Sequence, residues 1–339
     1  MPTIFSISEL QALLPSPNPS LFSASSAHAW SALFSSSSPS HIPTSLHGLF
    51  QDFIHDNFFH YSASLTPLTL RLLLHPIQSL LYQVRQLLTC FSDVLSTRPS
   101  STRTLTKAST LTYLEEVKSL LQKWYNFPIS VSGSADAPTK TINLTLFHLI
   151  SLSAHTSFPS LERFARRSPA TLSTAISHWD LSLQHKNCIF DSSSALFHAG
   201  QILRLVALSD LRDRRLPWAS LAVYRATLIL WFDVLAMSDP SFPPPTPQGP
   251  IVVINASAAD DAALMGLLWK GVGVPVLRCR DGSMCRLQAP EVVLEACIGF
   301  VGGEDGGGSG TGGRLADGIV RKLRMLKGNW HCARGLPVP

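Results

Sequence analysis

Apolar side chains recur at steps of three and four residues along most of the chain, a spacing typical of amphipathic helices. The first clear set is Leu46, Leu49, Phe50, Phe53, Ile54 and Phe58. The same spacing predicts helices over residues 68–95, 111–124, 142–153, 158–166, 169–184, 192–208 and 217–237. Pro76 falls inside the second helix and lacks a backbone donor, so a break or kink is expected there. Polar stretches at 99–106 and 130–140 are predicted loops.

The pattern changes after residue 250. Residues 251–254 form a short β-type run, and residues 258–270 return to helical spacing. Residues 274–287 hold two strand-like runs around Asp281-Gly282, a dipeptide typical of a tight hairpin turn. Helices are expected again over 290–300 and 315–330, on either side of a glycine-rich loop at 302–313. The predicted fold class is therefore all-α, a multi-helix domain with a minor C-terminal β-hairpin.

Composition shifts along the chain predict four parts. Residues 1–45 are a Ser/Pro-rich segment with enough apolar residues to pack on the body, and residues 46–237 form the helical domain. Residues 238–250 are a Pro-rich connector. Residues 251–339 form a C-terminal α+β appendage that includes the glycine-rich loop.

Composition indicates a packed chain. Hydrophobic residues make up 45% of the 339 residues and charged residues only 14%, against about 25% charged in an average soluble domain. This balance excludes a disordered tail, which lacks the apolar residues needed to offset chain entropy. The net charge of +5 is spread over small clusters at 163–167, 212–215 and 314–327. Such faces can attract phosphate backbones, but solvated helix faces are the favoured interpretation.

Neither export nor membrane insertion is predicted. The most apolar stretch, 216–237, contains Arg225 and Asp233, whereas a membrane span needs about 20 apolar residues with few charges. A buried core helix fits better. The N-terminus has no basic start and carries Glu9, unlike a signal peptide. The six cysteines, at 90, 188, 279, 285, 297 and 332, are therefore expected to be reduced thiols.

Two groups of residues could hold a metal. His178, His185 and Cys188 could approach one another near a helix end, but structural zinc usually has four ligands and no fourth is evident. Ordinary helix residues are favoured. Cys279 and Cys285 flank the predicted hairpin turn, where a disulfide or metal is the alternative to two reduced thiols.

No catalytic, cofactor-binding or metal-binding residues are predicted, and the chain is not expected to be an enzyme. Gly308-x-Gly310-x-x-Gly313 has the form of a nucleotide-binding loop, yet lies between helices, where that motif needs a preceding strand. No GxSxG elbow or HExxH helix occurs. The carboxylate pairs at 115–116 and 260–261 look like solvated helix residues.

Five aromatic residues lie on helical patterns beside leucines, and core packing is the expected role for most of them. They are Trp179, Trp218, Tyr224, Trp231 and Trp269. A hydrophobic groove for a partner helix or a small ligand is the alternative left open.

Several ordered blocks resemble the C-terminal regulatory region of fungal C2H2 zinc-finger transcription factors, which carry the fungal-specific transcription factor domain, or xylanolytic activator regulatory domain. The first block is Ser8-Glu9-Leu10, Leu14-Pro15 and Leu21-Phe22-Ser23-Ala24-x-Ser26-Ala27-x-x-Trp30, with Phe22 in place of the family's usual Trp. The second is Leu196-Phe197-His198-Ala199-Gly200-Gln201-Ile202-Leu203-Arg204. Then come Pro217-Trp218, Ala222-Val223-Tyr224-Arg225-Ala226-Thr227-Leu228-Ile229-Leu230-Trp231, Gly271-x-Gly273-x-Pro275-x-Leu277 and Leu315-Ala316-Asp317-Gly318-Ile319.

The resemblance implies a nuclear transcription regulator that acts through other regulators, co-factors or an effector. The segments 197–204 and 218–231 are the contact patches to test, although a scaffold role is favoured for both. The family's zinc and DNA contacts belong to C2H2 fingers, and the required C-x2–4-C spacing is missing from this sequence. The chain is therefore expected to be a fragment without its fingers, and a homodimer is left open. The alternative is a stand-alone helical ligand-binding or effector-sensing protein without direct DNA binding.

Overall fold

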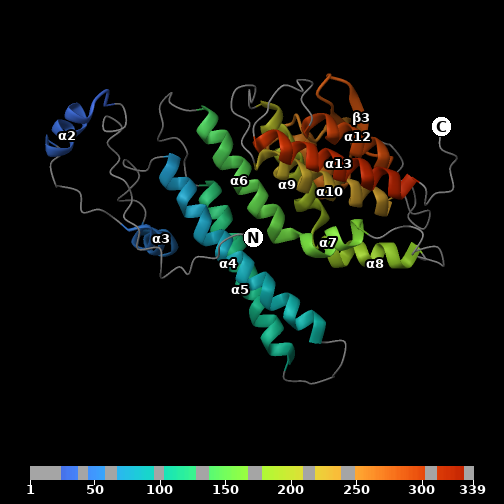
Figure 1. The fold of residues 1–339 in the computed structure, drawn as a ribbon. Helices are drawn as coiled ribbons and strands as arrows, with labels where there is room; N and C mark the ends of the chain where they lie inside the picture. The colour runs from blue at the N-terminus through green and yellow to red at the C-terminus, as the bar shows by residue number, and fades with distance from the viewer. Residues whose placement is uncertain are drawn as a thin grey trace. The chain divides into compact units, whose positions relative to one another are not determined.

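The computed structural model describes residues 24–36, 45–57, 67–94, 103–126, 137–166, 178–208, 218–237, 249–301 and 311–331. Within these ranges the chain forms twelve helices and one three-stranded sheet, which confirms the predicted all-α class with a minor β element (Figure 1). The chain divides into two compact units, Met1–Asn143 and Leu144–Pro339. The predicted four-part division stays a prediction.

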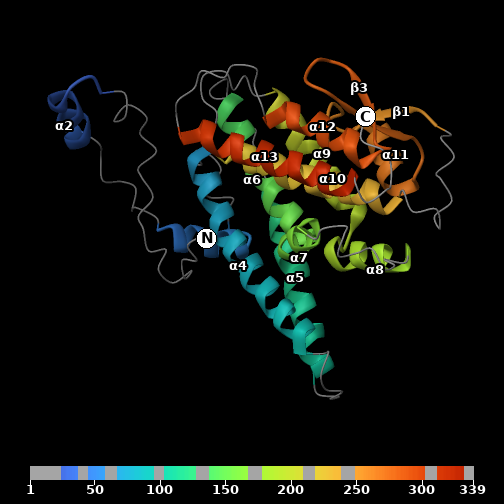
Figure 2. The same ribbon diagram turned by 45° about the vertical axis from the view of Figure 1, so that its right-hand side comes forward.

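The first unit is helical. Its helices are α2 (Ala27–Ser36), α3 (Leu46–Ile54), α4 (Pro67–Val94), α5 (Arg103–Asn126) and the start of α6 (Ala137–His155). Ser45 caps α3, because its side chain accepts a hydrogen bond from the Gly48 amide at 3.0 Å. Helices α4 and α5 run side by side (Figures 1 and 2), and Trp124 Nε1 donates to the Leu70 carbonyl at 2.9 Å.

Helix α4 continues through Pro76, so the predicted break does not occur, whereas the kink predicted as its alternative stays a prediction. A proline inside a helix costs about 3 kcal/mol. Its neighbours Leu73, Leu74 and Ile77 are at most 1% exposed, and burying each such side chain contributes about 1.5–3 kcal/mol. Packing on both sides of the proline therefore outweighs the lost hydrogen bond.

Two loops predicted in this unit are shorter than expected. Helix α5 already begins at Arg103 and α6 at Ala137, both inside the polar stretches predicted as loops. Asn143 joins α6 to α4, since Arg71 Nε donates to its side-chain oxygen at 2.9 Å and its own amide donates to the Pro67 carbonyl at 2.8 Å. Polar composition therefore does not mark where these two helices begin.

The second unit is built around one apolar helix. Its helices are α7 (Phe158–Ala165), α8 (His178–Cys188), α9 (Ser192–Leu208), α10 (Ala219–Met237), α11 (Ala262–Lys270), α12 (Pro290–Val301) and α13 (Thr311–His331). Helix α10 packs against α7, α8, α9, α12 and α13 (Figure 2). Among the described residues it is the helix long and apolar enough to cross a membrane, but 78% of that apolar window is buried inside the protein. It is the buried core helix that the sequence predicts.

The sheet has the order β1-β2-β3, formed by β1 (Ile251–Val253), β2 (Val274–Arg278) and β3 (Met284–Arg286). Strands β2 and β3 are antiparallel, and Gly282 in their turn has φ 85°, which confirms the predicted hairpin. The sequence did not predict that β1 pairs in parallel with β2 across α11. Parallel pairing requires such a crossover, because the second strand must start from the same end as the first.

Predicted helix ends in this unit shift by a few residues. Helix α11 begins at Ala262 rather than 258, because Asp261 caps it by accepting from the Ala263 and Leu264 amides. Helix α8 extends to Cys188, and α13 starts at Thr311, inside the predicted glycine loop. Predictions for residues 1–23, 169–177, 238–248 and 302–310 lie outside the described residues.

Candidate functional site

The two segments singled out for testing lie in the core of the second unit. In α9 the apolar residues Ala199, Ile202 and Leu203 are fully buried, and in α10 Trp231 is buried too. Both segments therefore serve as scaffold in this unit. The polar side chains between these apolar ones form three buried clusters, which are the candidate sites.

The first cluster holds three histidine rings. Nδ1 of His148 on α6 lies 2.9 Å from Nδ1 of His198 on α9, so one ring donates its proton to the other. His155 stacks on His198 with ring centroids 5.7 Å apart. Phe147 and Phe197 contact the pair edge-on. His148 and His198 are 2% and 9% exposed, so solvent scarcely reaches either ring.

Burial keeps this histidine pair uncharged. Burial lowers the pKa of His148 to about 3, with a further contribution from the Arg204 charge. The pKa of His198 also lies well below its ordinary value, first because of burial and then because of His148 and His155. The pair is neutral at physiological pH and acts as a hydrogen-bonded strut between α6 and α9.

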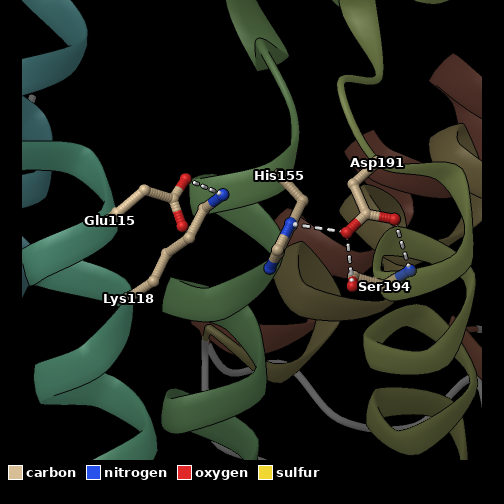
Figure 3. Close-up of polar contacts among 5 residues, drawn as sticks. All are labelled: Glu115, Lys118, His155, Asp191 and Ser194. Atoms are coloured by element: carbon tan, nitrogen blue, oxygen red, sulfur yellow. Dashed lines mark hydrogen bonds and ion pairs between the residues drawn. The ribbon is translucent and has the colours of Figure 1, made fainter. Parts of the chain in front are cut away.

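Asp191 links the third histidine to the start of α9 (Figure 3). It caps the helix by accepting from the Ser194 amide at 3.1 Å and from the Ser194 hydroxyl at 2.6 Å. Nδ1 of His155 lies 3.5 Å from the same carboxylate.

Figure 3 also draws Glu115 and Lys118, which form an ion pair on α5 at 2.8 Å. The pair lies on a helix surface, as expected for solvated residues.

The second cluster unites a serine, a histidine and an aspartate without forming a catalytic triad. His185 Nε2 lies 3.1 Å and Ser192 Oγ 2.5 Å from the same oxygen of Asp233. A hydrolytic triad needs the serine bonded to the histidine, which is oriented by the aspartate. Here both groups bind the buried carboxylate, and the cluster ties α8, α9 and α10 together.

The predicted zinc alternative does not assemble in the described part of the chain. His185 is directed at Asp233, Cys188 is 1% exposed within the apolar core, and the His178 side chain lies outside the described residues. No group of three potential ligands among the described residues is arranged to hold a metal ion.

The third cluster joins α9 to the sheet. A Cβ added at Gly200 would lie 2.7 Å from the Ile254 carbonyl oxygen, so only glycine allows this approach. Next to it, Gln201 donates to the Ser257 carbonyl at 3.1 Å. Asn255 bonds the backbone of Arg278 twice, as donor and as acceptor, both at 2.8 Å. This α9–sheet junction explains a glycine and a glutamine in the middle of an apolar helix.

The described cysteines are free thiols, as predicted. Burial raises the pKa of the Cys297 thiol to about 12, and its hydrogen bond with Thr227 opposes this only in part. Burial also raises the pKa of Cys285, to which neighbouring Cys279 contributes. Since the thiolate is the reactive form, the buried thiols are chemically shielded.

Alkylation by iodoacetamide should show this shielding. In the folded chain at pH 8, Cys297 is expected to react about a thousandfold more slowly than in the urea-unfolded chain, because a pKa of about 12 leaves little thiolate. Cys279, which is only partly buried, should be modified in the folded protein. Mass spectrometry of the digested chain measures both. Equal labelling of Cys297 with and without urea would contradict the burial described.

Three of the five singled-out aromatic residues have the expected core role, since Tyr224 and Trp231 are buried and Trp218 packs against the core. Trp231 and Tyr224 are 0% and 7% exposed, and Trp231 contacts Trp330 with ring centroids 5.5 Å apart. Trp269 departs from the prediction and is 66% exposed, because the inward positions of α11 are taken by Leu264 and Leu268. The side chain of Trp179 lies outside the described residues.

Sequence reasoning missed most members of these clusters. His148 and His155 lie two turns apart on α6, a spacing that could have placed them on one helix face. In the sequence Asp233 argues only against a membrane span, although a buried carboxylate also requires polar partners. The pairing of Asn255 with Arg278 had no local signal.

Comparison with known proteins shows that this chain is similar to fungal transcription factors. No protein-family model matches it, and no solved structure matches significantly. A transcription factor of Zymoseptoria tritici is 36% identical over 95% of this chain. Transcription factor 1 of Elsinoe fawcettii is 35% identical over 95% of it, and transcription factor PfmaH of Pestalotiopsis fici 33% identical over 96%.

The chain spans about a third of the length of these relatives, namely 35%, 33% and 33%. It is thus homologous to a segment of fungal transcription factors, which confirms the sequence resemblance at that level. Membership of the fungal-specific transcription factor domain and the association with C2H2 fingers stay predictions.

Proposed function

We propose that this chain is a helical regulatory region of a fungal transcription factor, which acts in the nucleus by contacting other proteins. The observation that carries the proposal is similarity over at least 95% of the chain to three proteins named transcription factors. A regulatory rather than a catalytic role agrees with the three described polar clusters, in which side chains bond one another and the backbone in the interior.

In this proposal DNA is read by C2H2 fingers rather than by the helical region. A finger needs two cysteines separated by two to four residues, then two histidines separated by three to five. Five residues separate Cys279 from Cys285, which is more than a finger allows, and Cys188 lies in the apolar core. The residues of this chain therefore do not fit a zinc finger, and no step of the proposed function passes through zinc.

A reporter assay tests the proposal. The full chain is fused to an unrelated DNA-binding domain and tested on a reporter with the matching operator. It should change transcription by about tenfold, because the fusion raises the local concentration of the chain, and of the proteins it binds, at the promoter. The DNA-binding domain alone is the control for promoter occupancy. The purified chain should show only salt-sensitive, sequence-independent affinity for duplex DNA.

Two results would contradict the proposed function. One is a folded, nuclear fusion that leaves reporter output equal to that of the DNA-binding domain alone. The other is sequence-specific binding of duplex DNA by the isolated chain, since the proposal assigns that activity to fingers outside it.

A further inference from the structure

Helix α13 has one buried face and one strongly basic face. Its inward residues pack against α10 and α12, and they are Ala316, Ile319, Leu323, Leu326 and Trp330. Its exposed residues include Arg314, Arg321, Lys322 and Arg324, against the single acidic residue Asp317. Both ribbon views show α13 along the outside of α10 (Figures 1 and 2).

The charge on this outer face is largely uncompensated within the described residues. Lys327 pairs with Glu295 of α12 at 2.6 Å, whereas none of the three arginines of α13 has an ion-pair partner in the described part of the chain. Lys322 lies over the Tyr224 ring, 5.2 Å from its centroid, which carries the positive surface onto α10. An incoming acidic group therefore meets cations that no described carboxylate already holds.

A single stripe runs along this outer face. It consists of Arg314, Gly318, Arg321, Met325 and Gly328, spaced by four, three, four and three residues. This alternation averages 3.5 residues per turn, the repeat with which two helices stay in contact along a seam. The face is thus patterned for another helix.

The two glycines of this stripe have no explanation inside the described chain. A Cβ added at Gly318 or Gly328 would meet nothing within 4 Å, and neither has the positive φ that requires glycine. Glycine inside a helix is destabilising relative to alanine. A second helix crossing closely would explain both positions, because the distance between helix axes depends on the side chains at the crossing.

Met325 indicates what kind of partner fits. It is 62% exposed between the arginines, and Leu315 beside the stripe is 42% exposed. A phosphate backbone gains nothing from these apolar groups, whereas an amphipathic helix can bury them while its carboxylates accept from the guanidinium groups. The favoured occupant is therefore a protein helix that is acidic as well as apolar.

We propose that the outer stripe of α13 is the docking surface for an acidic amphipathic helix of a partner protein. This inference rests on the proposed function, for which it names the chemistry of the partner.

Fluorescence anisotropy with the full chain tests the inference. The probe is a fluorescein-labelled synthetic peptide of about three heptads of Leu and Glu, compared with the same peptide carrying Gln for every Glu. The Leu/Glu peptide should bind, and the Leu/Gln peptide should bind about tenfold more weakly because it offers no charge. The variant R314E/R321E should weaken binding of the Leu/Glu peptide by about tenfold or more, because like charges repel.

Gly318→Leu separates docking from folding. The substitution removes a helix-interior glycine at an open position, so the thermal midpoint should stay the same or rise. Binding of the Leu/Glu peptide should nevertheless fall by about tenfold, because the added side chain holds the partner helix away. Arg280→Glu reverses one exposed charge in the β2–β3 turn, away from α13; it controls for charge reversal itself and should leave binding unchanged.

Three outcomes would overturn the inference. They are failure of the Leu/Glu peptide to bind, binding that survives R314E/R321E, and duplex DNA that displaces the peptide at an equal concentration of negative charge. The reporter fusion distinguishes this failure from that of the proposed function. If the inference alone is wrong, the fusion alters the reporter and R314E/R321E does not change its effect; if the proposed function is wrong, neither fusion alters it.

Discussion

Replacing Gly200 by valine is expected to lower the free energy of unfolding by about 3 kcal/mol, the upper part of the range for overpacking a core. Even the first added carbon would lie 2.7 Å from the Ile254 carbonyl oxygen. That oxygen belongs to the backbone directly after β1 and cannot rotate away. Helix α9 must then separate from the sheet, which also strains the bond from Gln201 to Ser257.

Urea unfolding followed by circular dichroism measures this effect. Gly266→Ala in α11 is the matched control, because nothing lies within 4 Å of a Cβ at that position. It should stabilise the protein by up to about 1 kcal/mol through helix propensity. If the Gly200→Val variant unfolds at the same urea concentration as the wild type, α9 does not approach the end of β1 as closely as described.

Acidification from pH 7 to pH 5 is expected to destabilise the second unit by about 2 kcal/mol through His148 alone, and His198 adds a further loss in the same direction. The pKa of His148 falls from 6.5 to about 3 on folding, and that of His198 falls well below 6.5. Below pH 6.5 these two histidines therefore bind protons in the unfolded chain but stay unprotonated in the folded chain. Stability is fully present above pH 6.5 and is lost as the pH falls toward the folded pKa, at about 1.4 kcal/mol per pH unit for His148.

Unfolding curves at half-unit pH steps check this dependence. His198→Gln removes one of the two groups and should make the slope between pH 6 and pH 5 measurably shallower. His55→Gln, at an exposed position after α3, is the control and should keep the wild-type slope. An unchanged slope in His198→Gln would mean that the buried pair does not govern acid stability.

Local signals predicted most helices but few of their contacts. The ends of α7 and α9 follow from sequence, because apolar spacing and the residues flanking it act within a few positions. The helix is not broken at Pro76 because burial of Leu73 and Ile77, a tertiary effect, outweighs a local one. The pairing of β1 with β2 was missed because a parallel ladder forms between segments that no short pattern connects.

The candidate sites were harder to predict for the same reason. His148 and His198 lie fifty residues apart, and only packing of α6 on α9 unites them. Gly200 was recognised as part of a resembling block, yet its role depends on a strand end more than fifty residues later. Trp269 follows a helical pattern, but spacing alone does not say that another face of α11 is the one buried.

During synthesis α10 leaves the ribosome before some of the helices that cover it. Its buried side chains emerge well before the helices that finally cover them, since Trp231 contacts Trp330 near the C-terminal end of α13. Until then the most apolar helix of the unit lacks part of its covering, which exposes the nascent polypeptide to aggregation. A premature stop codon before α13 would therefore yield a product held by chaperones and removed by proteases, not a shorter working protein.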